Sequence, residues 1–217
     1  RQGELVAGAI GGLLSSTATT VGNAKRAADG GDADTLVAGA LAAGMVSYGR
    51  TALLVFGLAP ALLPRVGIAL GSAALVMATA AYLFARRDQG RHEATHPANP
   101  FDLMAVFQIA LVLAGIAFAA RAASSWFGEA GVIAVAALAG LGDVDAPVIT
   151  ATGLVGNSLS EGAAAAAILV AVASNTAAKA AYALAFGSPR FGRAFAAASL
   201  AALSLGGAVT WLVGALP

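Results

Sequence analysis

Seven apolar stretches divide this chain, and their lengths constrain the fold more than any other feature of the sequence. Each can cross about 30 Å of hydrocarbon as a helix that rises about 1.5 Å per residue. Hydrophobic residues make up 59% of the chain and charged residues only 11%, whereas a soluble domain carries roughly 25% charge. We therefore expect an all-α, polytopic membrane helix bundle of about seven transmembrane segments. They cover residues 5–22, 35–58, 61–85, 101–126, 131–155, 162–186 and 191–216.

A polar linker over residues 88–100 is the clearest internal boundary. It divides a single membrane domain, 1–217, into a half of three segments, 1–87, and a half of four, 101–217. The linker contains both histidines, His92 and His96, together with proline. We interpret these histidines as solvated rather than as metal ligands.

Charge and cysteine content exclude several classes of protein. A net charge of +1 argues against a nucleic-acid partner, because phosphate binding needs a concentrated basic face. The chain has no cysteine, which excludes disulfides, thiolate metal sites and cysteine nucleophiles. The partners we expect are the lipid bilayer and a second copy in a homodimer. Because the chain opens at Arg1 without a basic n-region, we expect a processed chain or a fragment of a longer one.

Two carboxylates, Asp143 and Asp145, lie inside the segment 131–155. An ionisable group at bilayer depth costs several kcal/mol and is functional by default. Gly140 and Gly142 precede the pair and Pro147 follows it, which predicts a helix broken over Asp143–Pro147. On an intact helix the two side chains would point about 200° apart, but at a break they can share an ion, as in transporters. The alternative is a kinked helix whose carboxylates cap a backbone.

A cluster of hydroxyl side chains lies inside the first segment. It comprises Ser15, Ser16, Thr17, Thr19 and Thr20. One interpretation places these hydroxyls at a second helix break, opposite the carboxylates, where they complete an oxygen-lined ion site. The other has them bond to their own helix or join neighbouring helices.

Three polar residues lie deep in other segments. Asn175 and Lys179 are spaced i, i+4 and therefore share one helix face; Arg50 lies nearer the end of its segment. We expect Asn175 to join Asp143 and Asp145 as an ion ligand. Lys179 and Arg50 would tune the charge of the site by pairing with a carboxylate when the site is empty. The alternative for both cations is snorkelling to an interface or a static pair.

The available ligands are carboxylate, amide, hydroxyl and backbone carbonyl oxygens. Such hard donors suit Mg²⁺, Mn²⁺ or Ca²⁺ better than soft metals. Without cysteine or an intramembrane histidine, Zn²⁺ is disfavoured, and Mg²⁺ or Mn²⁺ is favoured. No cofactor is expected beyond this bound or transported ion.

The sequence also repeats itself with an offset of 128 residues. Residues 12–18 align with 140–146, and 47–50 align near 174–179. This predicts a duplicated four-helix unit, with one helix upstream of Arg1 and both copies in the same orientation. If all seven segments cross, five basic residues fall on each side and the positive-inside rule does not fix the orientation. A re-entrant segment would change that count.

The motifs at 11–20, 140–146 and 174–176, with Lys179, resemble a bacterial membrane domain. It is the uncharacterised carboxy-terminal membrane domain (domain-of-unknown-function family 4010) of MgtC/SapB-type proteins. The resemblance covers essentially the whole chain. It implies a multi-pass protein of the bacterial inner membrane, loosely associated with magnesium homeostasis. It supplies no established catalytic residues.

The sequence therefore predicts a membrane transporter or channel for divalent cations. The ion would be partly dehydrated, held at the helix breaks, and released by movement of one half against the other. The alternative is a non-transporting regulatory module that binds other membrane proteins. We do not expect an enzyme, because an aspartyl protease needs two aspartates on separate elements.

Overall fold

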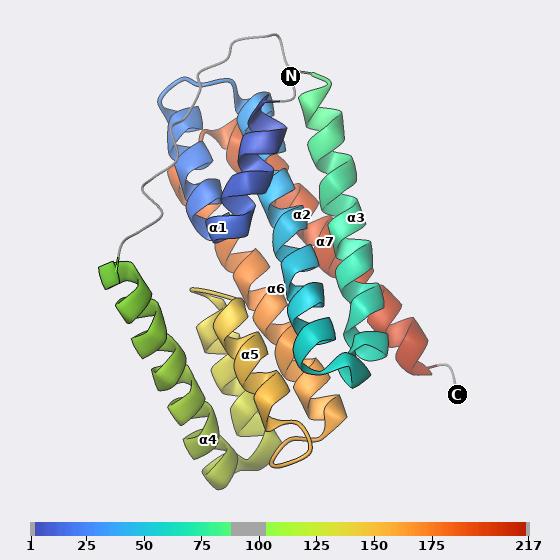
Figure 1. The fold of residues 1–217 in the computed structure, drawn as a ribbon. Helices are drawn as coiled ribbons and strands as arrows, with labels where there is room; N and C mark the ends of the chain where they lie inside the picture. The colour runs from blue at the N-terminus through green and yellow to red at the C-terminus, as the bar shows by residue number, and fades with distance from the viewer. Residues whose placement is uncertain (1–2, 88–102, 216–217) are drawn as a thin grey trace. The chain divides into compact units, whose positions relative to one another are not determined.

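The computed structural model describes residues 3–87 and 103–215, so the linker 88–100 and its two histidines lie outside the described residues. Within the described part the chain forms seven α-helices (Figure 1), and the expected all-α architecture is confirmed. They are α1 (Gly3–Ala28), α2 (Ala33–Leu58), α3 (Leu63–Ala85, after a 3-10 turn at Pro60–Leu62), α4 (Leu103–Gly140), α5 (Asp145–Leu154), α6 (Glu161–Phe186) and α7 (Pro189–Ala215).

Five of these helices are long and apolar enough to cross a membrane, judged by length and composition. They are α1, α2, α3 with its preceding turn, α6 and α7. Helix α5 has 10 residues and is therefore only about 15 Å long, which is too short to span. The chain is a multi-pass membrane protein.

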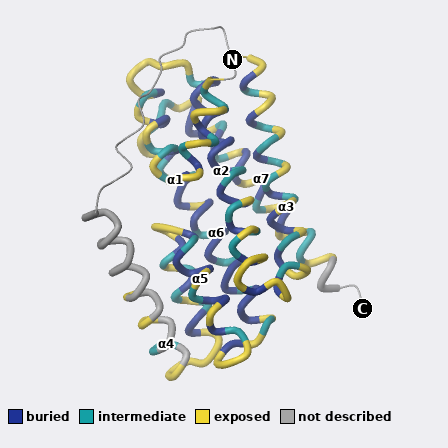
Figure 2. The backbone as a smooth tube through the Cα atoms, in the orientation of Figure 1, coloured by how far each residue is buried: buried dark blue, intermediate teal, exposed yellow. Residues whose placement is uncertain are grey.

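The helices belong to two compact units, which we describe separately. One comprises Arg1–Arg50, Gly67–Thr95 and Thr176–Pro217, and the other Thr51–Val66 and His96–Asn175. Helices α2 and α6 contribute residues to both. They are also the most buried of the five long apolar helices, and Figure 2 shows their buried faces.

Helix α1 folds back on itself. Ser15 leaves the helical conformation, with φ −161° and ψ 104°. The Glu4 carboxylate lies 3.0 Å from the Arg26 guanidinium, whereas a straight helix would separate these residues by about 33 Å. The two arms are so close that a Cβ on Gly11 would lie 2.5 Å from Thr19 Oγ1. Residues 3–28 therefore form a helical hairpin, hairpin 1, with its tip at Ser15.

The second half of α4 and helix α5 form a similar hairpin. Helix α4 reverses at Gly128, whose φ of 59° and ψ of −145° are readily adopted only by glycine. A Cβ on Gly131 would lie 2.4 Å from Ala123 O, so the second arm starts against the first. After Gly140 the chain turns, and α5 returns alongside α4 (Figure 1). Residues 129–154 form hairpin 2, with its tip at 141–145.

The base of hairpin 2 is closed by hydrogen bonds across the loop that leads into α6. The backbone N–H of Ser160 donates to Glu129 Oε1 at 2.7 Å, so the beginning and the end of the hairpin meet. Hydrogen bonds from the Ser160 side chain and backbone hold the pKa of the Glu129 carboxyl below its usual range. Hairpin 2 therefore enters and leaves at one end of its unit.

These hairpins correct the expectation for two of the apolar segments. The stretch 131–155 does not cross as one helix; it divides between two short arms, and the first segment does the same. The break lies at 141–144, before Pro147, which is the third residue of α5. Proline is tolerated there because the first N–H groups of a helix have no intrahelical acceptor.

The structure shows the internal duplication at the predicted offset. Helices α2 and α6 have 26 residues each and begin 128 positions apart. Gly12 packs against the backbone of Ala43, and Gly140 packs in the same way against Ala171. Each repeat consists of one hairpin followed by two long helices, rather than the four helices expected from the sequence.

Contacts within each unit give the direction of the repeats. The start of α2 is joined to the start of α7 by a bidentate ion pair of Asp34 with Arg190, at 2.9 and 2.6 Å. The hydroxyls of Tyr48 and Thr176 lie 2.9 Å apart, halfway along α2 and α6. Helix α6 ends where α2 begins, so these two equivalent helices are antiparallel.

The repeats are therefore inverted, and the expectation of a parallel repeat was wrong. An ion pair of Arg65 with Glu161 joins the start of α3 to the start of α6, as expected for antiparallel α2 and α6. The sequence-based count treated each hairpin as a crossing. In the structure each hairpin turns back on itself, so the equivalent helices of the two repeats do not have to share one orientation.

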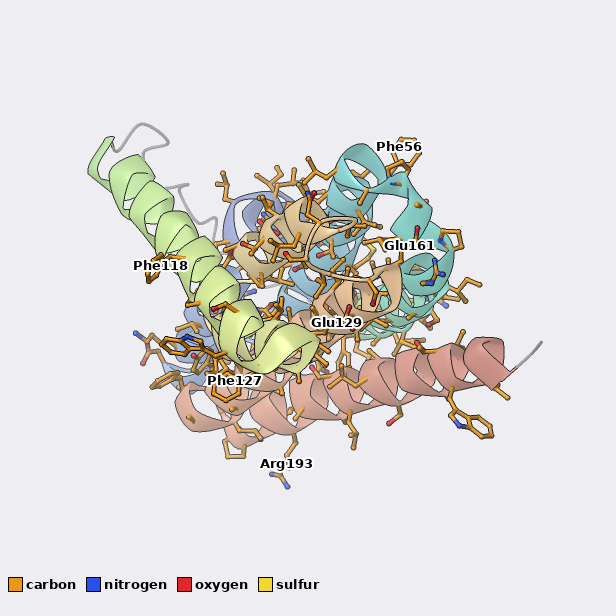
Figure 3. The ribbon with its side chains drawn as sticks, turned by 90° about the horizontal axis from the view of Figure 1, so that it is seen from below. Phe56, Phe118, Phe127, Glu129, Glu161 and Arg193 are labelled. Carbon is orange, nitrogen blue, oxygen red and sulfur yellow. The ribbon has the colours of Figure 1, made fainter. Side chains whose placement is uncertain are left out.

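The first arm of α4 exposes large apolar side chains. Phe118, Trp126 and Phe127 are 76%, 78% and 70% exposed, and Figure 3 shows Phe118 and Phe127 projecting from the helix. Aromatic side chains gather at membrane interfaces. Trp126 and Phe127 lie beside the turn at Gly128, where an interface anchor is expected.

Candidate functional site

The tip of hairpin 2 carries both predicted carboxylates. Asp143 Oδ2 accepts a hydrogen bond from the backbone N–H of Ala146 at 3.2 Å. Val144 already has helical backbone angles, with φ −92° and ψ −27°, so this bond from Asp143 caps the first turn of α5. A carboxylate is stabilising at this position because helix N-termini carry unpaired N–H groups and a partial positive charge. Asp143 is exposed, whereas Asp145 is half-buried.

Asn175 binds the same tip at the end of α4. Its Nδ2 donates to Gly140 O at 3.0 Å, where α4 ends. Asn175 is buried on α6, halfway along that helix. A Cβ on Gly140 would lie 2.4 Å from Ala171 O, so the end of α4 contacts the α6 backbone directly. The tip is therefore held at the middle of α6.

The turn between the arms contains Gly142, whose N–H donates to Ala139 O at 3.1 Å. The tip thus brings together two carboxylates, the amino end of α5 and the carboxyl end of α4. No group of three or more His, Cys, Asp or Glu side chains among the described residues could hold a metal ion. A cation at this tip would combine carboxylate oxygens with backbone carbonyls, amide oxygens or water, which are ligands that Mg²⁺ and Ca²⁺ accept.

The tip of hairpin 1 has the same local design without the carboxylates. Ser15 Oγ accepts a hydrogen bond from Ala18 N at 3.2 Å and so caps the second arm. Thr19 Oγ1 donates to Ser15 O at 2.9 Å, and Thr20 Oγ1 donates to Ser16 O at 2.8 Å. These hydroxyls bond to their own helix, which was one of the two interpretations of this cluster. Thr17 is half-buried.

Both intramembrane cations contact hairpin 1. Lys179 is 4% exposed, and its Nζ donates to Ser16 Oγ at 3.0 Å. Arg50 Nη1 donates to Leu13 O at 2.7 Å, at the carboxyl end of the first arm, where a cation is stabilised by the helix dipole. Lys179 is therefore buried rather than snorkelling, and both cations position this tip.

The predicted site residues are divided between the two compact units. Asp143, Asp145 and Asn175 belong to one unit, together with Gly140, Gly142 and Pro147. The hydroxyl cluster, Arg50 and Lys179 belong to the other. Helix α6 carries Asn175 and Lys179 one turn apart.

Sequence reasoning missed one buried contact near the centre of the bundle. Tyr48 is 4% exposed and lies in hydrogen-bond distance of Thr176. A single tyrosine in an apolar segment gives no signal of this pairing. The alignment of residues 47–50 with 174–179 is the one sequence feature that marked both stretches.

Comparison with known proteins gives one match. Residues 1–187 match the family model described as "Domain of unknown function (DUF4010)". No curated protein and no solved structure matches the chain.

Proposed function

Because the chain belongs to domain-of-unknown-function family 4010, whose description assigns no activity, we propose a function from the residues themselves. The protein is a membrane transporter or channel for divalent cations, and the ion binds at the tip of hairpin 2. One observation carries this proposal. Two inverted repeats each contain a broken helical hairpin, and one hairpin tip holds two carboxylates halfway along α6. Broken helices within inverted repeats form the ion sites of many secondary transporters.

The energetics favour a functional interpretation of this tip. A carboxylate halfway across a membrane costs several kcal/mol unless it faces water or a bound cation. Two carboxylates balance one divalent charge, and the remaining positions can be filled by water, which Mg²⁺ gives up reluctantly. Mg²⁺ and Mn²⁺ are therefore the first ions to test.

Ion flux into proteoliposomes tests this proposal. We expect wild-type protein to carry Mg²⁺ or Mn²⁺, and the double variant Asp143→Ala, Asp145→Ala to fall to the level of empty liposomes. Asp29→Ala, in an exposed turn, removes a carboxylate elsewhere and should leave flux unchanged. Wild-type flux in the double variant would contradict the site. No flux in the wild type, with membrane proteins co-purifying, would favour the regulatory module instead.

We also propose an orientation in the membrane, based on the basic residues at the two ends of the helices. With neither hairpin counted as a crossing, two basic residues, Arg65 and Arg121, lie toward one end of the helices. Six lie at the other end, where α2 begins: Lys25, Arg26, Arg86, Arg87, Arg190 and Arg193. Positive residues gather on the cytoplasmic side, so that end faces the cytoplasm. We place the protein in a bacterial inner membrane, as a homodimer.

Cysteine labelling in intact cells measures this orientation directly, since the chain has no cysteine of its own. We expect Asn157→Cys, in the loop between α5 and α6, to react with a membrane-impermeant maleimide. Asp29→Cys, between α1 and α2, should react only after permeabilisation. The reverse pattern would invert the proposed orientation.

A further inference from the structure

The two hairpins share a common framework, so the residues that differ between them carry information about function. In both hairpins a glycine at the end of the first arm packs on an alanine backbone: Gly12 on Ala43, and Gly140 on Ala171. The two glycines are 128 positions apart in the sequence, and so are the two alanines. The framework is thus the same in the copy with carboxylates and in the copy without them.

The residue after the turn is also equivalent in its role. Asp143 accepts the N–H of Ala146 at 3.2 Å, and Ser15 accepts the N–H of Ala18 at 3.2 Å. An N-cap requires only a side-chain oxygen that can accept this bond, and serine and aspartate serve about equally. The hydrogen bond made by Asp143 therefore needs no carboxylate.

The next position of the motif is different. Hairpin 1 has Thr17 where hairpin 2 has Asp145. Asp145 is half-buried at the first turn of α5, whereas Asp143 is exposed. A less solvated charge interacts more strongly with a nearby cation, because the effective dielectric constant is lower. At this partly buried position hairpin 2 has a charged side chain and hairpin 1 has a neutral one. Asp145 is thus the carboxylate that distinguishes the two hairpins.

We propose that Asp143 is a positioning residue that fixes the start of α5, and that Asp145 supplies the carboxylate that binds the cation. This division of roles rests on the proposed function of hairpin 2. Ser15, the equivalent of Asp143 in hairpin 1, also caps a helix, so capping is the role that both copies share. Thr17, the equivalent of Asp145, has no charge, so ion binding is the role that only hairpin 2 has.

Substitutions taken from the other repeat test the proposal. The measurement is the melting temperature of purified protein in detergent during titration with Mg²⁺ and Mn²⁺, because a ligand of the folded state raises it with concentration. Asp145→Thr should remove the ion-dependent rise in melting temperature, measured against the value of the same variant without ion. Asp145→Asn, which keeps the shape of the side chain, should do the same.

For the positioning residue we expect loss and rescue. Asp143→Ala removes the cap and should lower the melting temperature without ion by a few degrees, at about 2–4 °C per kcal/mol for a chain of this size. It should also weaken ion binding. Asp143→Ser should restore the melting temperature and bring the dissociation constant to within about tenfold of wild type. A factor of about ten is what a divalent ion loses when a solvated negative charge is removed at a separation of about 6 Å.

Several outcomes would overturn this division. An ion response retained in both Asp145 variants would remove Asp145 as the ligand. An Asp143→Ser variant as unstable as Asp143→Ala, or one without any ion response, would remove the positioning role. If wild-type protein responds to neither ion, the proposed function fails for both ions. The stability of Asp143→Ser against Asp143→Ala then still decides whether Asp143 acts as a cap.

Discussion

Gly140→Leu is expected to prevent hairpin 2 from packing on α6 and to leave little folded protein. A Cβ at this position would lie 2.4 Å from Ala171 O and 2.8 Å from Ala171 Cα. Both atoms belong to the backbone of α6, so no side chain can rotate away to relieve the overlap. Such overpacking costs more than about 4–5 kcal/mol, which corresponds to a fall of more than about 10 °C in melting temperature.

The control for this substitution lies in the same hairpin. A Cβ on Gly153 of α5 meets no atom within 4 Å, so Gly153→Leu should stay near the wild-type melting temperature. In hairpin 1, Gly12→Leu should be as damaging as Gly140→Leu, because its Cβ would lie 2.7 Å from Ala43 Cα. The comparison is made by size-exclusion profile and thermal unfolding in detergent. Equal stability of Gly140→Leu and Gly153→Leu would refute the close packing of this tip.

Lys179→Gln is expected to tighten cation binding by a large factor. Lys179 lies one turn from Asn175 on α6, about 6 Å away. A positive charge beside the site repels a divalent cation twice as strongly as it repels a monovalent one. Removing the lysine charge should therefore raise the affinity for the divalent ion by at least about tenfold. Glutamine keeps a hydrogen-bond donor for Ser16, whose Oγ accepts a hydrogen bond from Lys179 Nζ.

Lys179→Arg provides the matched control, because it keeps the charge and changes only the shape of the donor group. We expect its affinity to remain near that of wild type in the same thermal titration. If the glutamine and arginine variants bind the ion equally, the charge of Lys179 does not tune the site. A slower flux in Lys179→Gln, despite tighter binding, would indicate that the charge helps to release the ion.

The site was only partly predictable from the sequence. The pair of aspartates beside glycine and proline correctly marked a break, and Asn175 does contact the same tip. The separate roles of the two aspartates depend on a hydrogen bond, from Ala146 N to Asp143 Oδ2, that spacing alone does not specify. The contact of Lys179 with Ser16 joins residues 163 positions apart, and only the packing of α6 against hairpin 1 brings them together.

The sequence by itself determined the class of protein and the positions of its elements. Long apolar stretches with few charges can be stable only as membrane helices, because lipid leaves no partner for free backbone groups. The self-similarity at 128 residues likewise gave the duplication. The tertiary structure alone decided that segments 5–22 and 131–155 turn back instead of crossing. An apolar segment of this length has the same composition whether it crosses as one helix or turns back as a hairpin. Only tertiary contacts, such as that of Glu4 with Arg26, distinguish the hairpin from the crossing helix. The inversion of the repeats and the orientation that we propose both rest on that one difference.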